Sequence, residues 1–121
     1  MSRVLGREVL ADGAASAGSD TTYTSSMKFD TSTGDVALKV DMVGAKTWTV
    51  TQQCSKDDHN WYDPTDGNET AIGAVCSTTT TAVSKWIVPT LAPAPYIRFK
   101  VVSGTAGATT YSISVIFSED I

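Results

Sequence analysis

The sequence has few charged residues and few of the side chains that commonly carry chemistry. Charged residues make up 18% of the 121 residues, and there are only two cysteines and one histidine. No apolar run approaches the roughly 20 residues of a membrane-spanning helix, so we expect no membrane partner. The heptads of Leu, Glu and Lys that define a coiled coil are also missing.

Positive charge is scarce as well. Nine Lys and Arg residues against 13 Asp and Glu residues give a net charge of −4. A DNA or RNA binder normally carries a basic face, because neutralising phosphates dominates its affinity. We therefore expect no nucleic-acid partner. Ser and Thr instead supply about a quarter of the chain, which predicts an acidic surface rich in hydroxyl groups.

Apolar and polar residues alternate with a period of two along much of the chain. The alternation is clearest in residues 35–43, 96–102 and 110–117, and it predicts strands that are buried on one face. No segment of a dozen residues shows the 3.6-residue period of a helix. We predict an all-β, antiparallel β-sandwich of seven to eight strands, either a jelly roll or immunoglobulin-like.

Two finer predictions concern the strands and turns of this sandwich. Trp48 and Trp86 lie on the apolar faces of their strands, which predicts that both are core residues. The dipeptides Thr33-Gly34 and Gly44-Ala45 indicate hairpin turns between successive strands.

The first 20 residues differ from the rest of the chain. Residues 12–20 are small and polar, as in a flexible linker. We interpret residues 1–20 as an extended N-terminal arm and linker that pairs with a neighbouring subunit; a frayed terminus is the alternative. The β-sandwich domain then spans residues 21–121, and removing residues 1–12 should leave it folded. The apolar anchors of the arm are Val4, Leu5, Val9 and Leu10.

One polar loop, residues 54–69, gathers most of the candidate chemistry. It contains His59 together with five acidic residues, Asp57, Asp58, Asp63, Asp66 and Glu69. No nucleophile-elbow sequence marks a serine for His59, and the acidic spacing does not match a helix-loop-helix calcium site. Turns also require Asp, Asn, Pro and Gly. We predict no catalytic residue, no metal site and no cofactor, with a calcium site in this loop as the alternative.

The expected state of the two cysteines depends on the compartment in which the chain folds. Arg7 and Glu8 interrupt the apolar residues near the start, so the sequence does not predict a secretion signal there. We expect synthesis in the cytoplasm, where Cys54 and Cys76 would be buried free thiols; a disulfide is the alternative.

Trp61 and Tyr62 follow the polar loop and are candidates for exposed aromatic side chains. Exposed aromatic rings of this kind stack against sugar rings. A carbohydrate-binding β-sandwich module is therefore one possible function, and a cover over one end of the sandwich is the other interpretation of this pair.

The segment Ser55-Lys-Asp-Asp-His-Asn-Trp-Tyr-Asp63 resembles the SxDGxNWYDV hairpin of small β-sandwich structural proteins of tailed bacteriophages. As in that pattern, a strand containing Thr49-Val50 precedes the turn, and Pro95-Tyr-Ile-Arg-Phe-Lys-Val101 and a final strand at 109–117 follow in the same order. The chain departs from the pattern at Asp58-His59, where the pattern has a glycine, and at Pro64.

The resemblance implies a virion component whose functional residues are interfaces. The expected function is a capsid decoration or cement protein that bridges capsid subunits on the capsid exterior, made in the host cytoplasm. Its expected partners are the major capsid protein or other virion proteins and further copies of itself, with a trimer as one arrangement. A tail, neck or fibre-base position is the alternative. The candidate interface residues are Val4, Leu5, Val9, Leu10, Trp61 and Tyr62.

Overall fold

The computed structural model describes residues 3–16, 21–29, 32–43, 48–78, 82–103 and 109–120. Every regular element in these ranges is a β-strand. These ranges contain no helix long and apolar enough to cross a membrane. The strands are β1 (Arg3–Ser16), β2 (Thr21–Tyr23), β3 (Met27–Lys28), β4 (Ser32–Val43), β5 (Trp48–Ser55), β6 (Ala74–Thr78), β7 (Ala82–Ile87), β8 (Tyr96–Ser103) and β9 (Thr109–Asp120).

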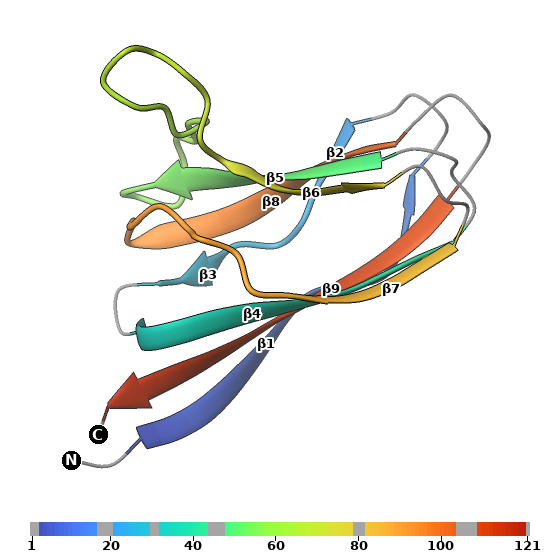
Figure 1. Cartoon of the computed structure of the whole chain (residues 1–121), viewed down its shortest axis with the longest axis horizontal. Coiled ribbons are helices and arrows are strands. Elements are labelled where there is room, and N and C mark those ends of the chain that lie inside the picture. Colours follow the sequence, from blue (N-terminus) through green and yellow to red (C-terminus); the bar gives the residue numbers. More distant parts are fainter. Residues whose placement is uncertain are drawn as a thin grey trace.

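The strands form two antiparallel sheets that face each other (Figure 1). One sheet has the order β1-β9-β4-β7, and the other has the order β2-β8-β5-β6, with β3 also paired to β8. Because β2 and β3 share one strand position, the sandwich has eight positions, in line with the seven to eight predicted. Except at β2–β3 and β5–β6, each successive strand lies in the opposite sheet. The predicted β-sandwich is confirmed, and its connectivity is that of a jelly roll.

This connectivity corrects the two predicted hairpin turns. Gly44-Ala45 lies outside the described residues, but the flanking strands β4 and β5 belong to different sheets and so do not form a hairpin. Thr33-Gly34 lies inside β4, where the pairing with β9 shifts register between Ser32 and Val36. Glycine and small or polar residues occur in hairpin turns, in connections between sheets and at irregular positions within strands. Composition alone therefore does not distinguish these three cases.

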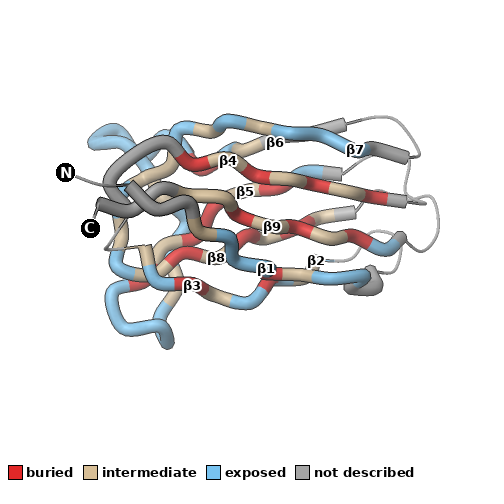
Figure 2. Tube along the Cα trace, turned by 90° about the horizontal axis from the view of Figure 1, so that it is seen from below, coloured by how far each residue is buried: buried red, intermediate tan, exposed pale blue. Residues whose placement is uncertain are grey.

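The hydrophobic core lies between the two sheets. Along β4 and β9, buried residues alternate with partly exposed ones, whereas much of β1 and β7 at the sheet edges is exposed (Figure 2). Burying each large apolar side chain contributes about 1.5–3 kcal/mol, so the sum over the core holds the sheets together. The largest fully buried apolar side chains include Leu38, Ile97, Phe99, Tyr111 and Ile113.

The expected N-terminal arm is the edge strand β1, which pairs with β9 of the same chain. The pairing passes from Val9 to Ala11, which leaves Leu10 in a bulge. Leu10 is buried, and its carbonyl oxygen accepts a hydrogen bond from the backbone N–H of Ser25 at 3.0 Å. Because Ser25 follows β2, this bond joins the two sheets along one side of the sandwich.

The described part of the expected arm, residues 3–16, therefore belongs to the sandwich. The physical reason is the bulge, which turns Leu10 into the core while leaving Val9 44% exposed. Removing residues 1–12 should destabilise the fold, because it uncovers β9 and removes a core side chain. The linker residues 17–20 lie outside the described residues.

The prediction that Trp86 is a core residue is wrong. Trp86 pairs with Lys39 on the outward face of its sheet, and its side chain is 62% exposed. Lys85 and Ile87, its neighbours in β7, pair with buried residues of β4. By register Lys85 lies on the inner face of this edge strand, opposite Val40, and its side chain is exposed; a charge placed in this way disfavours pairing with another sheet. The Trp48 side chain lies outside the described residues.

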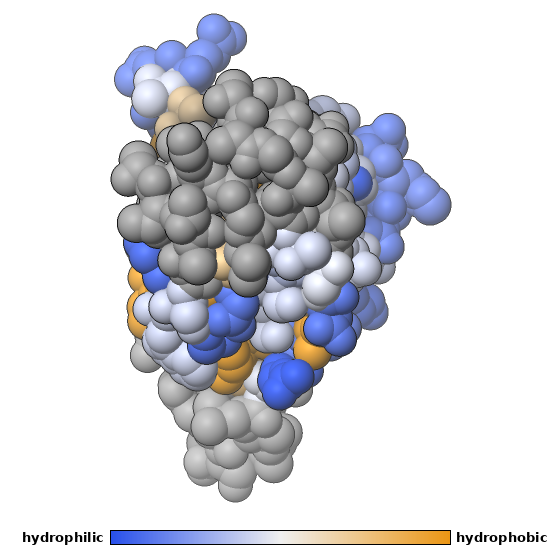
Figure 3. Space-filling model, turned by 90° about the vertical axis from the view of Figure 1, so that its right-hand side faces the viewer, coloured by the Kyte–Doolittle hydropathy of each residue, from blue (hydrophilic) through white to orange (hydrophobic). Residues whose placement is uncertain are grey.

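Viewed from the right-hand end of Figure 1, the described surface is mainly hydrophilic. Its hydrophobic patches are small and separated (Figure 3). Single exposed apolar groups of this size are normal on a protein surface, so the described residues form no large apolar face in this view.

A buried glutamine fixes the segment between β7 and β8. Gln52 is 1% exposed; its amide nitrogen donates to the carbonyl oxygen of Ala92, and its amide oxygen accepts from the Ala92 N–H, both at 2.8 Å. This pair of hydrogen bonds imitates a β-bridge and attaches the segment to β5. Nothing in the sequence pattern predicted it.

We expect Gln52→Leu to lower the free energy of unfolding by about 2 kcal/mol, because both polar groups of Ala92 lose their partner. Urea unfolding followed by tryptophan fluorescence measures the loss. Thr49→Val, at an exposed position of the same strand, keeps the β-branched shape; it is the control and should change stability by less than about 0.5 kcal/mol. Equal effects for the two variants would contradict this role of Gln52.

Candidate functional surfaces

The polar loop after β5 is organised around the carboxylate of Asp57. Its Oδ1 accepts hydrogen bonds from the backbone N–H groups of His59 and Asn60, at 3.0 and 2.9 Å, and its Oδ2 accepts one from the Asn60 side-chain amide at 2.8 Å. The Ser55 hydroxyl donates to the same carboxylate at 3.0 Å and accepts from the N–H of Asp58 at 2.9 Å. These bonds form the turn itself.

The same donors lower the pKa of Asp57 far below its usual value. The largest cause is the backbone N–H of Asn60, followed by that of His59. A second turn is built in the same way, because Asp66 Oδ1 accepts from the N–H groups of Asn68 and Thr70 at 2.8 and 3.1 Å. Both carboxylates are therefore used as turn acceptors.

Within the described residues, no group of three or more His, Cys, Asp or Glu side chains is placed to hold a metal ion. The histidine that the sequence singled out, His59, is exposed on the turn and contacts Asp57 through its backbone N–H. The geometry of this loop matches the turn interpretation of its acidic residues.

Asp58 occupies the position at which the phage hairpin pattern has a glycine. Its φ angle is 63°, in the left-handed region that glycine adopts most readily. Aspartate is among the residues that best tolerate this region, since its short polar side chain can hydrogen-bond locally. The turn therefore accommodates the departure from the pattern.

We expect the Asp57 carboxylate to stabilise the fold in a pH-dependent way. Because its folded pKa is lowered, its contribution is present above the unfolded pKa of about 3.9 and is lost as the pH falls through the folded pKa. The difference in melting temperature between the wild type and Asp57→Asn, which lacks the charge, should be largest at neutral pH. It should shrink below about pH 4; a difference that stays constant between neutral and strongly acidic pH would contradict this role.

A shallow hollow of about 240 Å³ lies at the start of this loop. Cys54 and Tyr62 exchange two backbone hydrogen bonds of 2.9 Å, which folds the chain back and places Tyr62 beside the segment that precedes β8. Tyr62 is 63% exposed. Its neighbours in the hollow include Lys56, Pro93 and Pro95. We call this surface the loop-end hollow.

Cys54 also lines the loop-end hollow and is a free cysteine. Partial burial raises the pKa of its thiol, so the group is protonated at neutral pH and less reactive than an ordinary surface thiol. The side chain of Cys76 lies outside the described residues.

Trp61 packs against Arg98 and does not line the loop-end hollow with Tyr62. The guanidinium carbon of Arg98 lies over the Trp61 ring and over the Tyr23 ring, at 4.5 and 4.2 Å from the two ring centres. Arg98 Nε donates to Gln53 at 2.8 Å, and the Gln53 amide donates to Asp63 at 3.0 Å. These contacts attach the loop to the outer face of β8, so Trp61 serves as a partly buried cover.

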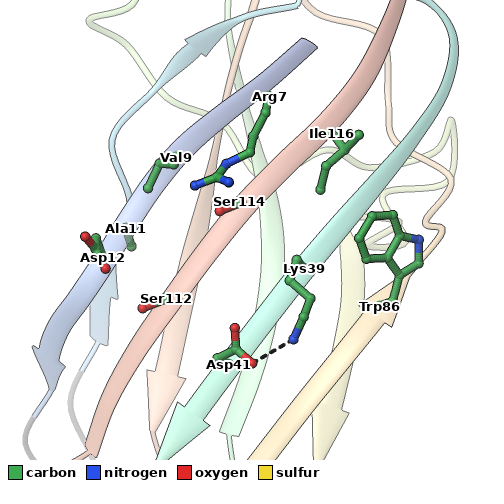
Figure 4. A pocket seen from close by; sticks show the side chains of 10 residues that line it. All are labelled: Arg7, Val9, Ala11, Asp12, Lys39, Asp41, Trp86, Ser112, Ser114 and Ile116. Atoms are coloured by element: carbon green, nitrogen blue, oxygen red, sulfur yellow. Dashed lines mark hydrogen bonds and ion pairs between the residues drawn. The ribbon is translucent and has the colours of Figure 1, made fainter. Parts of the chain in front are cut away.

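A larger hollow of about 450 Å³ crosses the outward face of the β1-β9-β4-β7 sheet (Figure 4). The strand register places Val9, Ser114, Lys39 and Trp86 in one row across the four strands. The row is low at its centre because the serine side chain is shorter than its neighbours in the row. Ser112 extends this low centre along β9. We call this surface the sheet groove.

An ion pair lies on the floor of the sheet groove. Lys39 Nζ is 2.7 Å from Asp41 Oδ1 and also donates to the Ser84 hydroxyl. The hydrogen bonds from Lys39 and then from Ser84 lower the pKa of Asp41. The alternation of apolar and polar residues did not predict this surface, because it placed Trp86 in the core.

The predicted interface residues whose side chains are described do not meet on one surface. Val9 lines the sheet groove and Tyr62 lines the loop-end hollow, while Leu10 belongs to the core and Trp61 packs with Arg98. The side chains of Val4 and Leu5 lie outside the described residues; their backbones pair with β9.

No protein-family model matches the sequence, and no curated protein matches it. Solved structures do resemble the fold. The PBSX exported protein XepA matches with a TM-score of 0.58 and 14% identity, over 96% of this chain and 38% of that chain. The chain therefore spans well under half the length of XepA.

Two further structures match along nearly their whole length. The SPBc2 prophage-derived protein YomS has a TM-score of 0.50 and 15% identity, over 95% of this chain and 96% of that chain. A chain of the disulfide-linked pili of Bacillus endospore appendages has a TM-score of 0.52 and 9% identity, over 100% and 92%. At these identities the likeness establishes a shared β fold with proteins of prophage and spore-appendage origin.

Proposed function

We propose that this chain is a non-enzymatic structural protein of a phage virion, and more specifically a decoration or cement protein on the exterior of the head. The observation that carries the proposal is the end-to-end likeness to the prophage-derived YomS. The likeness to XepA of PBSX and the phage-type hairpin at residues 55–63 support the same origin.

The use of the loop's polar groups supports a structural role. The carboxylates of Asp57 and Asp66 are occupied by backbone N–H groups of their own turns, which rigidifies the surface. A rigid surface loses little entropy when it binds. The net charge of −4 favours a place outside the shell, away from packaged DNA.

The loop-end hollow is the contact that we assign to the capsid. Tyr62 offers a large aromatic side chain at small entropic cost, and Pro93 and Pro95 form a rigid wall beside it. The sheet edges suit strand addition less well, because β1 carries a bulge at Leu10 and β7 carries the inward-facing Lys85. Contact through the side chains of the loop-end hollow fits better. These side chains would bind the major capsid protein and further copies of the chain, as in a trimer.

Co-sedimentation with purified phage heads tests the proposal. The wild-type chain should pellet with heads, and Tyr62→Ala should weaken binding by about 2 kcal/mol, or roughly 30-fold, as for a central aromatic contact. Val88→Ala, at an exposed position outside the hollow, is the matched control and should bind as the wild type does.

Each other outcome counts against part of this proposal. Binding to purified tails and not to heads would replace the decoration role by the tail, neck or fibre-base position. Absence of binding to either particle by a folded wild-type chain would contradict a virion role. Equal binding by wild type and Tyr62→Ala would move the contact away from the loop-end hollow.

A further inference from the structure

We infer that the sheet groove is a binding site for a short, uncharged oligosaccharide. The groove combines an exposed indole, a fixed ion pair and short hydroxyl side chains on one open sheet face (Figure 4). This inference does not rest on the virion role, and it concerns a different surface from the loop-end hollow.

Trp86 supplies the apolar part of the site. Its indole stands at the β7 side of the groove (Figure 4) and is 62% exposed. One exposed aromatic residue would need no explanation by itself. Here it stands in register beside the Lys39–Asp41 pair, so a sugar ring that stacks its C–H face on the indole brings its hydroxyl groups to polar partners.

The ion pair and the serines supply the polar part. Lys39 Nζ and Asp41 Oδ1 lie 2.7 Å apart and so present a donor and an acceptor side by side. A sugar hydroxyl both donates and accepts, and hydrogen bonds to charged groups are the stronger ones. Ser112 and Ser114 carry hydroxyls of their own and leave room above β9 for the ring.

The size and charge of the groove select the ligand class. Its volume of about 450 Å³ falls in the usual range of roughly 300 to 1,000 Å³ for ligand sites. The row from Val9 to Trp86 crosses three strand spacings, about 14 Å in all, which suits a chain of sugar rings. Two cations, Arg7 and Lys39, balance two anions, Asp12 and Asp41, so the lining favours an uncharged ligand over a polyanion.

The structure thereby moves the carbohydrate site away from Trp61 and Tyr62. The Trp61 ring is in contact with Arg98, and Tyr62 borders a hollow walled by proline. Neither aromatic side chain has an ion pair in register beside it, among the contacts that the described residues make.

Calorimetric titration of the full chain with glucose, galactose and N-acetylglucosamine oligosaccharides tests the inference, with polygalacturonate as the charged comparison. At least one neutral oligosaccharide should bind, with a change in tryptophan fluorescence. Trp86→Ala and Ser114→Leu, which fills the low centre, should each weaken binding at least tenfold. Tyr62→Ala is the control and should bind as the wild type does; thermal melting verifies that every variant is folded.

Three results would overturn the inference. The first is no heat of binding for any neutral oligosaccharide at millimolar concentration. The second is unchanged binding by a folded Trp86→Ala. The third is preferential binding of polygalacturonate. If Trp86→Ala abolished co-sedimentation with heads while no saccharide bound, the groove would be a protein contact instead.

Discussion

The inward packing of alternate residues from both sheets is the interaction on which the rest of the molecule depends. Because side chains alternate strictly along a strand, burying Leu38 and Val40 forces Lys39 and Asp41 outward. The same register places Ser114 outward between the core residues Ile113 and Val115. The core thus determines which side chains line the sheet groove.

The edges of the sandwich are closed by local irregularities. The bulge at Leu10 bends β1. The Leu10 carbonyl oxygen accepts a hydrogen bond from the N–H of Ser25, on the side of the other sheet. The hydroxyl of Thr24, the residue before Ser25, accepts a hydrogen bond from the N–H of Phe99 at 3.0 Å. This bond continues the pairing with β8 in the gap between β2 and β3. Edge strands treated in this way resist lateral pairing, so the molecule offers faces and loops for binding.

The sequence predicted the fold well where one strand face is apolar and the other polar. This holds for β4, β8 and β9, whose inward residues follow directly from the period of two. Strand connectivity could not be predicted in the same way, because turn residues do not record which sheet the next strand joins. The choice between a jelly roll and an immunoglobulin-like sandwich therefore needed the structure.

The candidate surfaces were predicted less well, for two physical reasons. In β7, Lys85 and Trp86 depart from the rule that apolar side chains face the core and charged ones face solvent. An edge strand tolerates a charge on its inner face and an indole on its outer face. Near the start of the chain, the bulge separates Leu10 from Val9 in burial, although both are apolar. For Tyr62 the sequence left exposure and a cover over one end of the sandwich open; the side chain is exposed because it follows a turn that the loop's own polar residues hold.

The most direct test of the whole account is a cryo-electron microscopy reconstruction of phage heads incubated with the chain. We expect jelly-roll density on the outside of the shell, with the turn at residues 55–63 directed at the capsid and the sheet that carries Trp86 open to solvent. Density inside the shell, or a jelly roll seated on the capsid by that sheet, would contradict it.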